Sequence, residues 1–139
     1  MEKCLFTSFP YRFTLKPILF GEKAMEFHGL RLGNNYDLLV QRDEFRSLWT
    51  QFAEQRVIYP TGQRVLRFDP FKFYEDQFGY DYLLLFRHAI DQGDYLVLPV
   101  EMLLFLALLR IVHEPGETTK VTQDLALLIQ RLGVPLLPS

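Results

Sequence analysis

The spacing between apolar residues changes along the chain, and this change constrains the fold more than any other feature of the sequence. Over the first forty residues apolar and polar side chains alternate, as at 11–16 and 25–28. A period of two is typical of a half-buried β-strand. A further strand is expected at 36–40, after the turn-forming residues 33–35. The first forty residues are therefore predicted to form two to four strands.

From residue 43 the spacing becomes three and four, which is the period of an amphipathic helix. We predict a helix over residues 43–55, with Asp43 at its N-cap. Four large apolar side chains share one stripe of it: Phe45, Leu48, Trp49 and Phe52. Two β-branched and aromatic runs, 57–59 and 65–68, then flank the turn residues 60–63, which predicts a hairpin.

The second half of the chain has the patterns of helices. A capping acid and a proline open a predicted helix over residues 70–91, or two shorter helices broken at Gly79, because glycine disfavours helix interiors. A further helix is predicted over residues 100–113, and its apolar residues surround so much of its axis that we expect it to be central. A last helix is predicted to start at Thr118 or Thr119 and to end at Gly133.

These elements predict an α+β fold. Antiparallel strands are expected mainly in residues 4–68, packed against three to four helices concentrated in the C-terminal half. A length of 139 residues suits one compact domain, so residues 1–139 are predicted to form a single α+β domain.

Composition excludes several classes of partner. Fifteen Lys and Arg against seventeen Asp and Glu give a net charge of −2, so we expect no nucleic acid to be bound. The most apolar stretch, 96–112, is interrupted by charges and a proline and falls short of a membrane span. The single cysteine, Cys4, has no internal partner for a disulfide, which favours a reducing compartment and a cytoplasmic location.

A search for catalytic or metal-binding patterns finds none. Neither Ser8 nor Ser47 lies in a Gly-x-Ser-x-Gly motif. The three histidines, His28, His88 and His113, are far apart and lack the spacing of metal ligands. The glycines are spread one to a turn and form no phosphate-binding loop. We therefore expect no catalytic residue, metal or cofactor.

The predicted helix at 70–91 carries the one surface that stands out. One side of this helix can face the core, while Phe73, Tyr80 and Leu84 lie on roughly the opposite side, with Asp76 and Arg87 around them. Large aromatic residues amid charges are typical of an interface centre and its rim. We predict that these five residues bind a partner, unless the last helices of the chain cover them.

Together these patterns favour a non-catalytic cytoplasmic protein-binding module. It would act as an adaptor or a neutralising partner for another protein, or associate with itself as a homodimer. The alternative starts from the aromatic content of 15%. It is an enzyme or a small-molecule binder with an aromatic-lined pocket.

Overall fold

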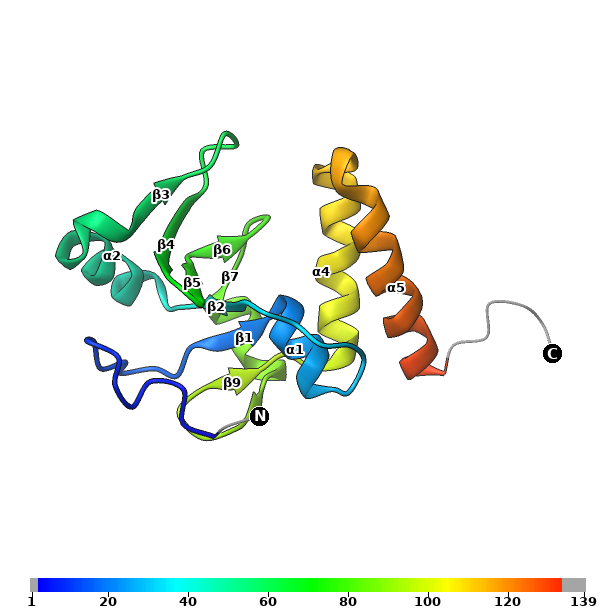
Figure 1. Ribbon diagram of the computed structural model, residues 1–139, viewed down its shortest axis with the longest axis horizontal. Coiled ribbons are helices and arrows are strands. Elements are labelled where there is room, and N and C mark those ends of the chain that lie inside the picture. Colours follow the sequence, from blue (N-terminus) through cyan, green and yellow to red (C-terminus); the bar gives the residue numbers. More distant parts are fainter. Residues whose placement is uncertain (1–2, 134–139) are drawn as a thin grey trace.

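The computed structural model describes residues 3–133, with the side chains of residues 117 and 118 excepted, and has a mixed seven-stranded sheet at its centre (Figure 1). The strands, in spatial order, are β3 (Arg56–Ile58), β4 (Arg64–Phe68), β5 (Phe71–Tyr74), β2 (Tyr36–Leu39), β1 (Ile18–Phe20), β9 (Leu96–Val97) and β8 (Ile90–Asp91). β1 pairs with β9 and β2 with β5 in parallel, whereas the other neighbours are antiparallel. β6 (Asp76–Gln77) and β7 (Tyr80–Asp81) form a separate small hairpin.

Five α-helices lie among the described residues: α1 (Gly21–Phe27), α2 (Arg42–Gln51), α3 (Tyr82–Leu85), α4 (Val100–His113) and α5 (Thr118–Leu132). Three 3₁₀ turns accompany them: η1 (Ala53–Gln55), η2 (Phe86–His88) and η3 (Pro115–Glu117). The long helices α4 and α5 pack against each other as a helical hairpin beside the sheet (Figure 1). The predicted α+β fold is confirmed, with its longest helices in the C-terminal half.

Elements with a strong local pattern occur where the sequence predicts them. α4 has the predicted bounds, and α5 is followed by Gly133 in the left-handed conformation. β3 and β4 form the predicted hairpin. α2 corresponds to the predicted helix at 43–55, but it ends at Gln51, and its N-cap is Gln41 and not Asp43. The Gln41 side chain accepts a hydrogen bond from the Asp43 backbone N–H at 2.8 Å.

The predicted helix at 70–91 is wrong, and so is the alternative of two helices broken at Gly79. Residues 71–74 form β5, which lies between β2 and β4 and hydrogen-bonds to both. Aromatic residues favour strands, and two partner strands satisfy the backbone as well as a helix would. Phe78 and Gly79 both have positive φ and form the turn between β6 and β7.

Two strands predicted near the start of the chain are also wrong. Residues 11–16 have no regular structure, and residues 25–27 belong to α1. Glu44 of α2 holds the irregular segment in place. Its carboxylate accepts hydrogen bonds from the backbone N–H groups of Thr14 at 2.6 Å and of Leu15 at 3.1 Å. A side chain thus supplies the backbone partner that a neighbouring strand would have supplied.

The two faces of the sheet have different neighbours. One face, here called the aromatic face, carries Phe68, Phe71 and Phe73 and is covered by rings from the N-terminal segment. The opposite face, here called the polar face, carries Asp37, Lys72 and Tyr74. The strand register places Asp37 beside Lys72, and the Tyr74 hydroxyl contacts Asp37. The α4–α5 hairpin stands on the polar side.

α4 is not as central as its apolar sequence predicts. Leu103 and Leu106 are buried, but Leu108 is 49% and Val112 73% exposed. α5 and the small helix α1 cover only part of its circumference. Within residues 3–133 no helix has both the length and the apolar character needed to span a membrane.

Candidate ligand-binding cleft

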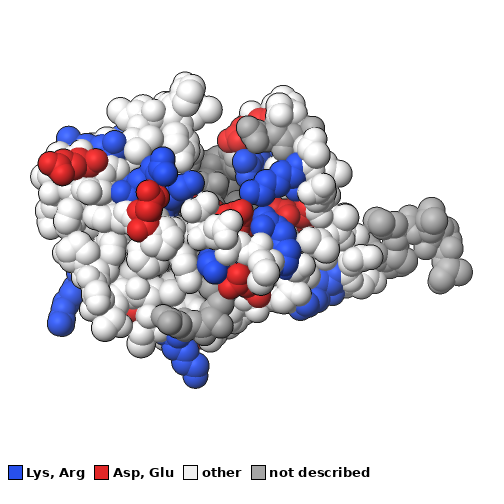
Figure 2. Space-filling model, viewed as in Figure 1, with Lys and Arg blue, Asp and Glu red and all other residues white. Residues whose placement is uncertain are grey.

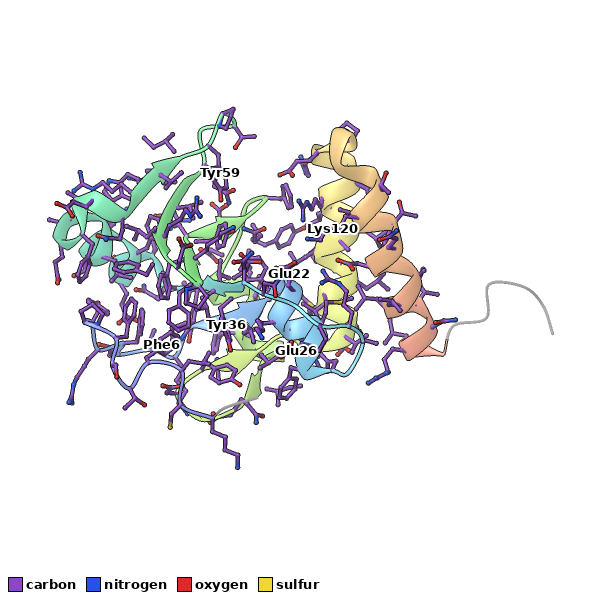
Figure 3. All side chains as sticks on the ribbon, viewed as in Figure 1. Phe6, Glu22, Glu26, Tyr36, Tyr59 and Lys120 are labelled. Carbon is purple, nitrogen blue, oxygen red and sulfur yellow. The ribbon has the colours of Figure 1, made fainter. Side chains whose placement is uncertain are left out.

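A cleft of about 350 Å³ separates the polar face of the sheet from the α4–α5 hairpin, and α1 forms its base. Figure 2 shows this hollow with charged side chains of both signs along it. In Figure 3, Tyr59 lies on the sheet side, Lys120 on the helical side and Glu22 between them. Among the described residues its charged lining groups are Arg31, Lys72, Arg110, Lys120, Glu22, Asp37, Glu114 and Asp124. Cations and anions are equal in number, so these groups carry no net charge.

A second hollow of about 420 Å³ continues the cleft toward the tip of the β3–β4 hairpin. Gln63, Phe78 and Glu114 line both spaces, so the two hollows adjoin. The Phe78 ring, at the tip of the β6–β7 hairpin, stacks on His113 of α4 with centroids 5.0 Å apart. This stack joins the sheet side to the helical side where the two hollows meet.

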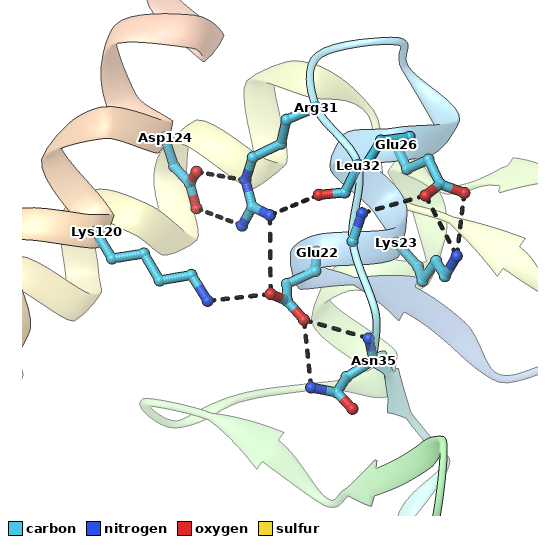
Figure 4. A network of polar contacts seen from close by, with 9 residues as sticks. Glu22, Lys23, Glu26, Arg31, Leu32, Asn35, Lys120 and Asp124 are labelled. Atoms are coloured by element: carbon cyan, nitrogen blue, oxygen red, sulfur yellow. Dashed lines mark hydrogen bonds and ion pairs between the residues drawn. The ribbon is translucent and has the colours of Figure 1, made fainter.

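A polar network at the base of the cleft ties α5 to α1 (Figure 4). Glu22 of α1 binds Lys120 of α5 at 3.0 Å, and its other oxygen accepts both the backbone N–H and the side-chain amide of Asn35. Arg31 makes a bidentate pair with Asp124 of α5, at 2.7 and 3.0 Å. These contacts join two elements that lie about a hundred residues apart in the chain.

The electrostatics of Glu22 follow from this network. Burial by itself would raise the pKa of Glu22, but the hydrogen bonds from Lys120 and Asn35 outweigh burial and hold the pKa below its ordinary value. Gly33 packs directly on Glu22, and a methyl group at that position would collide with it. Glu22 is therefore a charged structural link between α1, α5 and the loop before β2.

The floor of the cleft has a different kind of carboxylate. The Tyr74 hydroxyl donates to Asp37 Oδ1 at 2.9 Å, and no ion pair joins Asp37 to a described side chain. Burial raises the pKa of Asp37, because the charged carboxylate has lost much of its water. Burial and the nearby Asp37 charge also raise the pKa of Tyr74. Gly21, with a φ of +70°, lies so close that any side chain there would meet the Asp37 carboxylate.

Lys72 is the neighbour of Asp37 across the parallel β2–β5 pair, on the same face of the sheet. Among the described side chains it has no hydrogen-bond or ion-pair partner, although its charge acts on Asp37 through space. Glu22, Asp124 and Glu114 differ from this pair, because each has a cation within 4 Å. The floor thus presents two unlike charges side by side, neither of them neutralised by direct contact.

The predicted partner-binding residues are not brought together as one patch. Phe73 is fully buried on the aromatic face, and Tyr80 packs edge-on against Phe105 of α4 at 4.9 Å. Leu84 is 56% exposed on α3, and Arg87 is exposed in η2. Asp76 lies in β6 and lines the second hollow. The predicted grouping depended on a helical spacing that the chain does not have, and partner binding by the exposed members stays a prediction.

Sequence reasoning missed the residues of the cleft floor. A signal for them exists: Asp37 and Lys72 are single charges inside otherwise apolar or aromatic strands. A charge in such a strand has to reach water, a partner or a ligand. The pattern that predicts a helix over residues 70–91 hides this signal at Lys72.

The histidines and cysteine do not form a second site. His28 Nε2 lies 2.9 Å from the Leu98 carbonyl oxygen, and His113 stacks on Phe78. Cys4 is an exposed free thiol. In the part of the chain that the structure describes, no three His, Cys, Asp or Glu side chains are grouped so as to hold a metal ion.

The chain was compared with protein-family models, curated proteins and solved structures. No family model, no curated protein and no solved structure matches this chain. The functional conclusion therefore depends on the residues of the cleft alone.

Proposed function

We propose that this protein is a binding protein that holds a small polar ligand without net charge in the cleft between the sheet and the α4–α5 hairpin. The observation that carries the proposal is the charge-balanced lining of a hollow of about 350 Å³. That volume lies in the range typical of small-molecule sites. The lining combines aromatic rings, amide side chains and unlike charges, which suits the alternative that the sequence left open, a small-molecule binder with an aromatic-lined pocket.

The balance of charge supports a ligand of no net charge. Three of the four carboxylates already have cations of the protein as partners. A strongly anionic or cationic ligand would have to separate these pairs or bring its charge close to a like charge. A ligand with hydrogen-bonding groups but no excess charge can use Tyr59, Asn35 and Gln77 without that cost.

The proposal is tested by NMR titration of the ¹⁵N-labelled protein with three probes: D-glucose, L-phenylalanine and inorganic phosphate. We expect D-glucose or L-phenylalanine to shift the backbone amides of residues 35–37 and 72–78, and phosphate to leave them unchanged. Shifts caused by phosphate alone, or no shift with any of the three, would contradict the proposal.

Two variants separate the cleft from the rest of the surface. Ala107→Phe places a ring from α4 into the cleft, whereas Ala126→Phe adds the same ring on the exposed side of α5. Ala107→Phe should abolish the shifts, and Ala126→Phe should preserve them. If both variants respond alike, the probe binds elsewhere and the proposal is wrong.

A protein partner remains the second candidate, because α4 leaves Leu108 and Val112 exposed one turn apart. This surface faces away from the cleft and can coexist with it. If a partner or a second copy uses it, Leu108→Glu should weaken self-association, or capture of the partner, while cleft binding is unchanged. Light scattering measures the first of these effects, and association that persists at full strength argues against an interface on α4.

A further inference from the structure

We infer that the ligand of the cleft is a zwitterion of the α-amino acid class, with its ammonium group on Asp37 and its carboxylate on Lys72. This inference rests on the proposed function and adds the chemical class of the ligand. It comes from the two charged groups on the floor that the protein itself leaves without an ion-pair partner.

Asp37 is suited to bind an ammonium group. Its carboxylate receives one hydrogen bond, from Tyr74, and retains further acceptor positions. Gly21 lies against its other oxygen, and because Gly21 has no side chain the two fit together without a collision. A carboxylate that has lost water but has no cation in contact gains most from a charged donor, because both the hydrogen bond and the charge pair form in a partly desolvated site.

Lys72 is suited to bind the carboxylate of the same ligand. It points from β5 to the same side of the sheet as Asp37 does from β2, and the two are partners in the parallel register. Neighbouring strands lie about 4.8 Å apart, so the two side chains rise from adjacent points of the floor. One small ligand can contact both only if its own charges are a few bonds apart. The ammonium and carboxylate of an α-amino acid share one carbon atom and meet this condition.

The wall of the cleft opposite the floor indicates which kind of side chain the amino acid has. Between the charged groups of the helical hairpin, buried apolar side chains line the cleft there: Leu103, Leu106, Val121 and Leu128. Phe20 and Met25 extend this apolar surface toward the base. An amino acid held by its charged groups on the floor would place its side chain against this wall, so an apolar or aromatic side chain fits best.

Ligands with only one of the two charges fit less well. A monocarboxylate would pair with Lys72 but bring its charge close to Asp37, and a primary amine would do the reverse. Each would leave one charged group of the floor without a partner. The floor therefore discriminates against both by the same physical effect.

Calorimetric titration of the wild-type protein with three matched compounds tests the inference. L-phenylalanine has both charges, 2-phenylethylamine lacks the carboxylate and 3-phenylpropanoate lacks the ammonium group. L-phenylalanine should bind at least about tenfold more tightly than either analogue. Equal or tighter binding of one analogue would overturn the inference.

Variants assign each charge of the ligand to a residue. Asp37→Asn keeps an acceptor for Tyr74 and should weaken L-phenylalanine binding by at least about tenfold, whereas 3-phenylpropanoate should bind no more weakly than to wild type, because its carboxylate no longer lies near the Asp37 charge. Lys72→Met should weaken L-phenylalanine binding as much, whereas 2-phenylethylamine should bind no more weakly than to wild type, because its ammonium group no longer lies near the Lys72 charge. Lys16→Met is the matched control, because Lys16 pairs with Asp91 outside the cleft lining, and it should bind like wild type. If the control loses binding as the floor variants do, or the floor variants bind like wild type, the assignment is wrong.

The outcome also separates this inference from the proposed function. If D-glucose shifts the amides of the cleft while L-phenylalanine does not bind, the cleft is a ligand site and the zwitterion is wrong. If no probe reaches the cleft, both fail. The comparison of compounds uses the wild-type protein, so it remains decisive even if a floor variant does not fold.

Discussion

The aromatic and polar faces of the central sheet are covered in different ways, although the same strands supply both. On the aromatic face, rings from the N-terminal segment lie on Phe68, Phe71 and Phe73, with centroids 4.9 to 6.2 Å apart. On the polar face, Asp37 and Lys72 point into a cleft that the α4–α5 hairpin does not fill. Residues one position apart in β5 therefore belong to a closed core and to an open site.

The difference shows how side-chain chemistry determines whether a face closes. Every contact that removes water from an aromatic ring lowers the free energy of the folded protein, so a segment without regular structure is enough to cover these rings. Removing water from a charged group that has no partner raises the free energy of the protein. The helical hairpin is instead joined at its base to α1 and to the loop after α1 by ion pairs. Three substitutions test this comparison, in order of expected effect.

The largest effect is expected on the aromatic face. Phe73 is fully buried and its ring contacts those of Phe6, Phe9, Phe13 and Phe68. Phe73→Ala should lower the free energy of unfolding by about 3–5 kcal/mol, as measured in denaturant, because it leaves a cavity among rings. Leu84→Ala is the control, since Leu84 is exposed on α3, and it should change stability by less than about 0.5 kcal/mol. A small loss for Phe73→Ala would show that the aromatic face is not a closed core.

A smaller effect is expected at the contact between α1 and the floor of the cleft. Gly21→Ala should lower the free energy of unfolding by about 2–3 kcal/mol, because the new methyl group meets the Asp37 carboxylate and φ is positive. Gly62 also has positive φ but open space around it, so Gly62→Ala should cost only about 1 kcal/mol. Thermal unfolding compares the two, and equal losses would mean that Asp37 does not lie against Gly21.

The smallest effect is expected at the base of the cleft, and it depends on pH. The pKa of Glu22 is lower in the folded protein than in the unfolded chain, so its charge stabilises the fold above the unfolded pKa, and this contribution disappears as the pH falls. Glu22→Gln should therefore cost about 1 kcal/mol near pH 7 and progressively less toward about pH 3.

Denaturant unfolding at both pH values measures this dependence. The control is Glu54→Gln, at an exposed residue of η1 outside the network, which should leave stability unchanged at either pH. A loss for Glu22→Gln that does not shrink on acidification would show that Lys120, Arg31 and Asn35 hold Glu22 by shape and not by charge.

Local sequence determined the elements whose signals lie within a few residues. α4 follows from a mostly apolar stretch between Pro99 and the Glu114-Pro115 step, and the β3–β4 hairpin follows from turn residues between two β-branched runs. α5 ends at a glycine that adopts the left-handed conformation. The predicted α+β class follows from these same elements. Each of them needs only contacts between near neighbours in the chain, and periodicity reports such contacts.

Only the tertiary structure decided the state of residues 71–74 and the place of the site. Their aromatic spacing fits a helix as well as a strand, and β2 and β4 resolved the ambiguity by offering hydrogen bonds on both sides. The cleft is assembled from β2, β5, α1, α4 and α5, and two of its ion pairs, Arg31–Asp124 and Glu22–Lys120, join residues more than ninety positions apart. No window of sequence contains both partners of such a pair. The charges that line the cleft were visible in the sequence, but their convergence depended on the pairing of distant strands and the docking of the helical hairpin.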